Sequence, residues 1–221
     1  MSRAAVDNDV LLKLCIYSLH GLLRSDPICG IQDMACLGVA RYLLPKIVGK
    51  KSTSPSKEVV LQNIDELLAQ MAIIEPTQEE LELAASFESS ANEQNLPLDI
   101  GESQLCAIVM NRSWDYLLTG DKRAISAIGA LHNTNKLQGL AGKLICLEQI
   151  FLYWLKSNDA FIPIRECVCA APECDKALSL SFSCRSQALT LDSCTEGLKS
   201  YVRDVRRTAN GLLLLQGISV D

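Results

Sequence analysis

The sequence lacks both an excess of positive charge and a long hydrophobic run. Its 21 Lys and Arg residues stand against 26 Asp and Glu, for a formal net charge of −5. Binding to a phosphate backbone through charge alone needs a basic surface, so this balance disfavours a simple nucleic-acid-binding module. A nuclease is affected less, because its active site is acidic and a local basic rim can meet the substrate. No apolar stretch approaches the roughly 20 residues that span a bilayer, so no membrane partner is expected.

The N-terminal residues also lack the features of a secretory segment. No apolar region precedes the first acid, Asp7. We therefore expect a cytoplasmic protein whose ten cysteines are reduced thiols. The two histidines, His20 and His132, are isolated in sequence and do not indicate a catalytic dyad.

The cysteines near the C-terminus do not have the spacing of a zinc site. Structural zinc sites pair cysteines about two to four residues apart. Cys167 and Cys169 are separated by a single residue, and Cys174 and Cys184 follow at irregular spacing. Packed free thiols are the favoured interpretation. A zinc-stabilised adaptor centred on this patch is the alternative, and it predicts that the purified protein carries zinc.

What the chain does contain is enough apolar sequence for a core, arranged as short apolar segments that alternate with helical patterns. Hydrophobic residues make up 48% of the 221 residues. Strands are expected at residues 4–6, 71–74, 116–119 and 143–147. Helices are expected at residues 9–23, 30–44, 58–70, 77–92, 103–112 and 121–131, with another through residue 155. This alternation is typical of a parallel α/β sheet, whose site lies outside the carboxyl ends of the strands.

The predicted organisation is an α/β domain over residues 1–156 and a helical, cysteine-bearing C-terminal extension over residues 157–221. The extension has no clear strand pattern, and its main helix is expected over residues 196–215. That helix carries four positive charges within about two turns, at Lys199, Arg203, Arg206 and Arg207. They could form a rim for a nucleic-acid backbone or an ordinary solvated helix face, and the sequence does not favour either.

Acidic residues gather where three of the predicted elements begin or end. The clusters are Val6-Asp7-Asn8-Asp9, Asp99-Ile100-Gly101-Glu102 and Thr119-Gly120-Asp121-Lys122-Arg123. Carboxylates at the carboxyl ends of parallel strands suit Mg²⁺ or Mn²⁺, which prefer oxygen ligands. Each Asp could instead cap a helix, a role worth on the order of 1 kcal/mol. For one site alone we favour the cap, and for the three together we favour the metal.

The three clusters resemble the motifs of PIN-like nuclease domains, in the same order and with fitting spacing. The matching segments are Val6 to Leu11, Leu98 to Leu105 and Leu117 to Ala124, and the resemblance covers roughly residues 1–156. It implies metal-dependent hydrolysis of a phosphodiester, usually of RNA.

Carried over by position, the resemblance also assigns roles to individual residues. Asp7, Glu102 and Asp121 would be the catalytic metal ligands, with Asp99 as a further metal-binding candidate. Asp9 and Asp99 could bind the metal through water, and Thr119 could hydrogen-bond a carboxylate or the attacking water. Glu148 is a further candidate for a supporting acid. Lys122 and Arg123 would meet a phosphate of the substrate.

The sequence departs from the family pattern at one position. PIN-like domains usually carry a second acid, commonly Glu, on a helix between the first two strands. Residues 30–41 contain no clear Glu. Asp33, Glu66 and Glu148 are the candidate substitutes. If no acid from residues 30–70 reaches the other carboxylates, a catalytically inactive protein with this fold becomes the favoured prediction.

The predicted function is that of an Mg²⁺- or Mn²⁺-dependent endonuclease that cuts RNA rather than DNA. A nuclease of this size is reminiscent of toxin or defence components, which can have an inhibitory or homo-oligomeric protein partner. The rival prediction is a catalytically inactive PIN-like interaction protein that keeps the fold and has lost one ligand.

Overall fold

A parallel sheet forms the centre of the protein in the computed structural model, which describes residues 2–25, 30–50, 55–132, 137–156, 160–186 and 190–214. In these residues the sheet has five strands in the order β3-β2-β1-β4-β5, and every pairing is parallel. The strands are β1 (Ala4–Val6), β2 (Met34–Leu37), β3 (Ala72–Ile74), β4 (Tyr116–Thr119) and β5 (Leu144–Cys146). The expected parallel α/β architecture is therefore confirmed.

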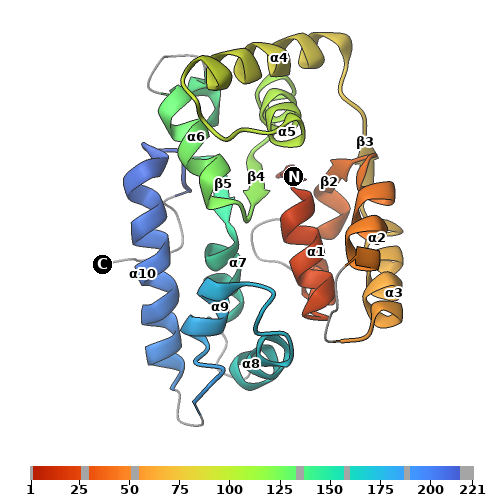
Figure 1. Ribbon diagram of the computed structural model, residues 1–221, viewed down its shortest axis with the longest axis vertical. Coiled ribbons are helices and arrows are strands. Elements are labelled where there is room, and N and C mark those ends of the chain that lie inside the picture. The colour runs from red at the N-terminus through yellow and green to blue at the C-terminus, as the bar shows by residue number, and fades with distance from the viewer. Residues whose placement is uncertain are drawn as a thin grey trace.

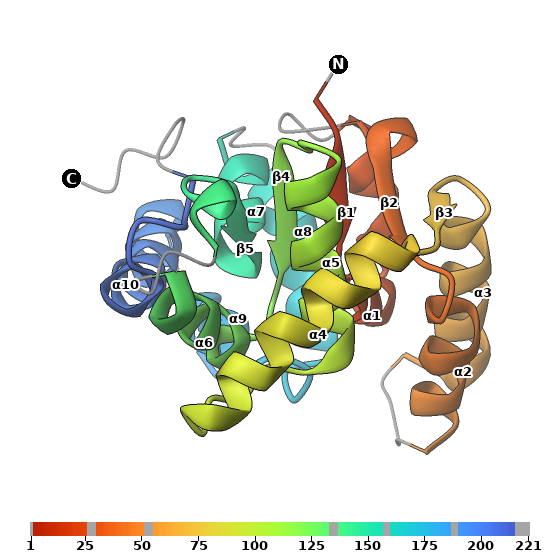
Figure 2. The same ribbon diagram turned by 90° about the horizontal axis from the view of Figure 1, so that it is seen from above.

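Helices surround this sheet and extend to both sides of the molecule. They are α1 (Asn8–Ile16), α2 (Ala40–Lys50), α3 (Lys57–Leu68), α4 (Gln78–Glu93), α5 (Ile100–Asn111), α6 (Lys122–His132), α7 (Leu147–Trp154), α8 (Phe161–Ala170), α9 (Lys176–Ser181) and α10 (Leu191–Ala209). Helix α10 lies at one side and α2 and α3 at the other, as Figures 1 and 2 both show. Helix α5 packs against the two central strands, β1 and β4.

Strand β2 replaces the first part of the helix that we expected over residues 30–44. All four of its residues, Met34 to Leu37, are buried. A short run that is apolar on both faces carries no period, so the sequence cannot separate a central strand from a buried helical segment. The helical pattern belongs to α2, which starts at Ala40.

The first and last predicted helices also have different limits in the structure. Helix α1 ends at Ile16, because the chain turns through Ser18 with a φ of 55° and continues as a 3₁₀ helix, η1 (His20–Ser25). Helix α10 begins at Leu191, where Thr190 caps it, and ends at Ala209, after which Asn210 adopts the left-handed conformation. Residue 215, where we expected this helix to end, lies outside the described residues.

The C-terminal extension shares one hydrophobic core with the sheet. Phe182 and Leu198 of the extension belong to the same buried cluster as the strand residues. Phe151 of α7 joins them, with its ring centroid 5.8 Å from that of Phe182. The chain after α10 also reaches the sheet, since Leu213 forms a parallel bridge with Leu144 of β5.

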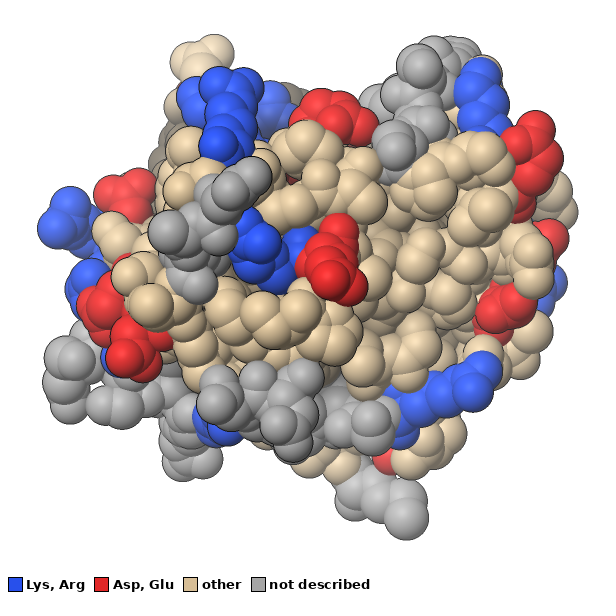
Figure 3. All heavy atoms as spheres, turned by 90° about the horizontal axis from the view of Figure 1, so that it is seen from below, with Lys and Arg blue, Asp and Glu red and all other residues tan. Residues whose placement is uncertain are grey.

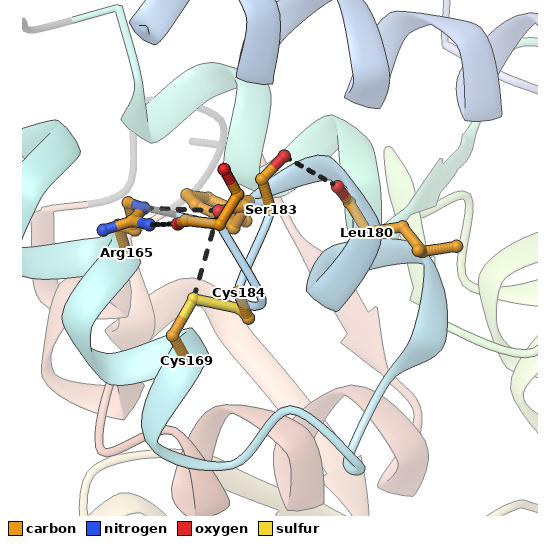
Figure 4. Close-up of a disulfide and its surroundings, with 7 residues drawn as sticks. Arg165, Cys169, Leu180, Ser183 and Cys184 are labelled. Carbon is orange, nitrogen blue, oxygen red and sulfur yellow. Dashed lines mark hydrogen bonds between the residues drawn. A yellow bond between two sulfur atoms is a disulfide. The ribbon is translucent and has the colours of Figure 1, made fainter. Parts of the chain in front are cut away.

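The expectation that all the cysteines are free thiols is wrong for one pair. Cys169 and Cys184 form a disulfide that joins the end of α8 to the turn after α9 (Figure 4). Arg165 supports the same turn by donating to the backbone carbonyls of Phe182 and Ser186. The two cysteines are 15 residues apart in sequence, so only the fold of the extension brings them together. Cys167 and Cys174 are free and half-buried.

Candidate functional site

The acidic residues of the first and third clusters meet in the middle of the sheet. Val6 of β1 is in register with Leu118 of β4, so the residues that follow these two strands emerge side by side. The strand order reverses at this point, and in open α/β sheets that is where ligands bind. A cleft of about 600 Å³ opens there. It is lined by Asp7, Asn8, Asp9, Leu12, Val39, Leu43, Ile47, Asp99, Ile100, Gly101, Glu102, Gln104 and Asp121.

Asp7 lines the cleft and directly follows β1. Its Oδ1 accepts a hydrogen bond from the Asn8 amide at 2.7 Å, so the side chain caps α1. Thr119, the last residue of β4, has its hydroxyl 3.5 Å from the other carboxylate oxygen. The same hydroxyl accepts from the Asp121 amide at 3.3 Å. Thr119 thus connects the two acids that follow the central strands.

Asp99 and Glu102 form a reciprocal cap at the start of α5. The Glu102 amide donates to Asp99 Oδ1, and the Asp99 amide donates to Glu102 Oε2, both at 2.9 Å. The capping role that the sequence offered as an alternative is therefore real for Asp99. It does not remove either acid from the site, because both side chains also line the cleft.

The acids of the cleft perturb one another. Burial raises the pKa of Glu102 to about 8, and Asp99, Asp7 and Asp121 add to the rise by like-charge repulsion. Burial also raises the pKa of Asp7 to about 6, with contributions from Asp9 and Asp99. Like charges held together in a cleft disfavour ionisation, and a cation placed among them would relieve this effect.

Asp121 differs from these two acids because it has a positive neighbour. Its carboxylate accepts from the backbone amide of Arg123 at 2.8 Å and from the guanidinium at 2.9 Å. Burial alone would raise the pKa of Asp121, but the hydrogen bonds from Arg123 outweigh it and lower the pKa. The Arg123 side chain is 79% exposed, so it can still meet an anion at the rim of the cleft.

Lys122 and Glu148 pair with each other and do not line the cleft. The Lys122 ammonium forms an ion pair with the buried Glu148 carboxylate. It also lies 4.7 Å from the ring centroid of Tyr201 on α10. Glu75, which follows β3, does not line the cleft either. The phosphate-binding role of Lys122 and the supporting role of Glu148 stay predictions.

No acid from helix α2 or α3 reaches the cleft. Asp33 precedes β2 and so lies at the amino-terminal ends of the strands, away from the cleft at their carboxyl ends. Glu66 is half-exposed on α3, where its carboxylate lies 3.5 Å from His20. The cleft wall on this side is formed by Val39, Leu43 and Ile47. The described parts of residues 30–70 therefore present an apolar face to the cleft and no acid. The i, i+4 spacing of these residues was the sequence signal for that face.

The donors of the cleft match a hard divalent cation in chemistry, since they are carboxylate oxygens that repel one another. Their arrangement is looser than a formed metal centre. Among the residues that the structure describes, no group of three or more His, Cys, Asp or Glu side chains is placed to hold a metal ion. The carboxylates of Asp99, Glu102 and Asp121 each also accept a hydrogen bond from a backbone amide at a helix start.

Among the described residues, positive charges form no continuous stretch on the face at the α8 end of the molecule. On this face, shown in Figure 3, Lys and Arg stand in separate groups among uncharged residues and acids. On α10, Lys199 and Arg203 face Glu196, while Arg207 faces Asp204. This helix is therefore closer to a solvated mixed-charge surface than to a basic rim.

Comparison of the chain with protein-family models and with curated proteins finds no match. Fold and site together define a parallel α/β protein with an acidic cleft at the point where the strand order reverses. In the described residues, no helix combines the length and apolar character needed to cross a bilayer.

Proposed function

We propose that this chain is a PIN-like, metal-dependent endonuclease that hydrolyses phosphodiester bonds, with RNA as the favoured substrate. The observation that supports the proposal is the convergence of Asp7, Glu102 and Asp121 from three distant segments on one cleft. Helix caps explain each acid by itself, but they do not require three caps to share a cleft.

In this proposal Asp7, Glu102 and Asp121 would hold Mg²⁺ or Mn²⁺, with Asp99 beside them. When bound, the metal supplies a water of lowered pKa and neutralises phosphate charge. The chain's own contribution is to fix the ligands. Thr119 orients Asp7, and the reciprocal cap holds Glu102 at the positive end of the α5 dipole. Because the pKa of Glu102 is raised to about 8, a proton competes with the metal for this carboxylate and must leave before the carboxylate can act as a ligand.

The rim of the cleft suits a chain-like anionic substrate. Arg123 projects beside Asp121 with most of its side chain in solvent. A guanidinium at this place can hydrogen-bond a phosphate oxygen while the acids stay deeper in the cleft. The adjacent apolar wall of Val39 and Leu43 can contact a base or sugar without demanding a sequence.

Two observations favour the second candidate, a catalytically inactive interaction protein: no acid from the described parts of residues 30–70 lines the cleft, and the apolar residues beside it are exposed. The apolar residues near the cleft are unusually exposed, at 42% for Val39, 37% for Leu43 and 63% for Ile100. Tyr42, on the same helix as Leu43, is 78% exposed. Exposed apolar residues gathered beside a cleft mark binding surfaces for proteins as well as for small ligands. In this alternative the cleft receives a protein partner, and no bond is cut.

A cleavage assay separates the two candidates. Single-stranded RNA and DNA are incubated with Mn²⁺ and either the wild type, Asp121→Asn or the control Asp192→Asn, which removes an acid from the first turn of α10. The nuclease proposal predicts metal-dependent cutting that Asp121→Asn reduces by at least about 100-fold, a loss typical of a catalytic group, and that the control retains. If the folded wild type cuts neither polymer, the interaction protein becomes the better explanation.

A further inference from the structure

Lys13 is a lysine with little solvent exposure, held between two acids from different parts of the chain. Its ammonium lies 2.6 Å from Asp9 Oδ2 and 2.9 Å from Asp175 Oδ2. Only 14% of its side chain is exposed. Burial alone would lower the pKa of Lys13, but the two carboxylates outweigh burial and raise it. The residue therefore carries a full positive charge inside the protein.

Asp175 belongs to the C-terminal extension and is fixed there on both sides. One of its carboxylate oxygens accepts from the Leu178 amide at 3.0 Å and caps α9, while the other meets Lys13. The disulfide between Cys169 and Cys184 closes the segment that contains it. The side chain is 11% exposed. Asp175 is thus a rigid second anchor for the lysine.

The turn after β4 is shaped to accept the pair of Asp9 and Lys13. A Cβ atom on Gly120 would collide with the Asp9 carboxylate and would come within 3.4 Å of the Lys13 ammonium. No other residue type fits at this position without moving the pair. Because Gly120 directly precedes Asp121, the ion pair is in van der Waals contact with the segment that carries a proposed metal ligand.

Lys13 is also well placed to offset the charge of the cleft. Asp9 lines the cleft and raises the pKa of Asp7 through its negative charge. Arg123 is the other cation paired with a cleft acid among the described residues, and it lies mainly in solvent. Salt screens an exposed charge strongly and a buried charge much less. Lys13 therefore places a weakly screened positive charge directly beside Asp9, one of the acids that line the cleft.

We propose that Lys13 is a built-in counter-cation of the acidic cleft, shared between Asp9 and Asp175, so that the C-terminal extension sets how strongly the cleft attracts a divalent cation. This inference rests on the proposed metal-dependent function. Lys13 is a positioning residue in this role, because it acts through Asp9 and touches neither metal nor substrate. Asp175 competes with Asp9 for the same ammonium, which leaves part of the Asp9 charge to the cleft.

The two partners of this arrangement have opposite expected effects. Lys13→Met removes a positive charge beside Asp9, and the affinity of the cleft for Mn²⁺ should rise by about fivefold. Asp175→Asn leaves Asp9 as the only charged partner of Lys13, so more of the Asp9 charge is neutralised. The affinity of the cleft for Mn²⁺ should then fall by about the same factor. Lys13→Arg keeps the charge and should stay within about twofold of the wild type.

The test is calorimetric titration of each purified full-length variant with Mn²⁺, after circular dichroism has shown that it is folded. Lys199→Met and Asp204→Asn are the matched controls, since they remove the same charges from ion pairs on α10. Opposite shifts for Lys13→Met and Asp175→Asn, with unchanged controls, support the inference. If Lys13→Met does not fold, Asp175→Asn and Lys13→Arg still decide it.

Two other results overturn the inference in distinguishable ways. Mn²⁺ binding by the wild type with variants no different from the controls would reject the counter-cation while leaving the metal site intact. A folded wild type that binds no Mn²⁺ would reject the metal site and, with it, this inference.

Discussion

Glu102 is a buried acid whose closest charged neighbours are also acids, and this makes the metal-free protein sensitive to pH. An acid whose folded pKa is raised binds more protons in the folded state than in the unfolded state. Stability then falls as the pH rises from the unfolded pKa to the folded pKa. For Glu102 that window extends from its ordinary value near 4.5 to about 8. The raised pKa of Asp7 changes the stability in the same direction, but this group ionises at a lower pH because its pKa is about 6.

We therefore predict that the metal-free protein loses stability between pH 6 and 8, by on the order of 2 kcal/mol. Glu102→Gln should make the profile flatter over this interval, because Gln keeps the cap of α5 and cannot ionise. Urea unfolding at a series of pH values measures both proteins. Parallel profiles would mean that Glu102 ionises as easily in the folded state as in the unfolded one.

At the scale of elements, an ion pair fixes α4 against α5 and so positions the acids at the start of α5. Arg112 donates two hydrogen bonds of 2.7 Å to the carboxylate of Glu80, and one of 2.8 Å to the carbonyl of Glu75. Glu80 is fully buried. The hydrogen bonds from Arg112 lower its pKa to about 2.

Glu80→Gln should lower the free energy of unfolding at pH 7 by about 2 kcal/mol, because it weakens a buried charged hydrogen bond. Since the folded pKa is depressed, this contribution is present above the ordinary pKa of 4.5 and disappears as the pH falls toward 2. Chemical denaturation at pH 7 and pH 3 measures the change. The neighbouring Glu79→Gln, which keeps the buried pair, should cost less than about 0.5 kcal/mol. An equal loss in both variants would assign the effect to the helix dipole instead.

Helix α2 is the element that departs most from a complete acidic site. Leu43 lines the cleft and is 37% exposed, so an acid at this position need not be buried. Leu43→Glu should tighten Mn²⁺ binding by about tenfold, because cation affinity grows with the number of carboxylates. Tyr42→Glu adds the same charge on the same helix outside the cleft wall and is the control. Calorimetry that shows equal effects for the two variants would indicate general electrostatics rather than a ligand position.

At the scale of the whole molecule, the extension is part of the folded unit around the sheet. Its buried residues join the central core, and the segment after α10 pairs with β5. We expect one cooperative unfolding transition for the full chain, since a shared core leaves no independent part to unfold first.

The disulfide should contribute to the stability of that single unit. It closes a loop of 15 residues, for which chain entropy predicts about 3 kcal/mol. Cys184→Ser should lower the free energy of unfolding by about this amount, whereas Cys167→Ser, at a free half-buried thiol, should change it by less than about 1 kcal/mol. Guanidinium unfolding with and without a reductant provides the measurement. A wild type that is insensitive to reductant would contradict the contribution.

Much of this architecture could be predicted from the sequence because its signals are local. The alternation of apolar and helical segments predicted the parallel sheet, and the helix expected over residues 77–92 matches α4 closely. The three acidic clusters also fall at strand ends and helix starts as expected. Strand β2 was missed because a short run buried on both faces has no period to read.

The remaining parts of the site depend on contacts between distant segments. Lys13 and Asp175 are 162 positions apart in the sequence (175 − 13), and the residues around each give no sign that the two will pair. The disulfide likewise depends on how α8 and α9 pack. Glu148 was expected to support the cleft acids, but its buried carboxylate pairs with Lys122. Which cation lies near a buried acid is set by the packing of the whole chain. Such choices follow from the tertiary structure, and short motifs do not encode them.

The central claim is that the acidic cleft holds a divalent cation, and anomalous X-ray scattering from a crystal grown with Mn²⁺ tests it most directly. The account predicts an anomalous peak inside the cleft, with carboxylate oxygens of Asp7, Glu102 and Asp121 at about 2.2 Å, close to the distances that such oxygens adopt around small divalent cations. Asp121→Asn crystals should show a weaker peak or none. The account would be contradicted if the cleft residues are clearly resolved but show no anomalous peak, while other acids on the surface of the same crystal do bind Mn²⁺.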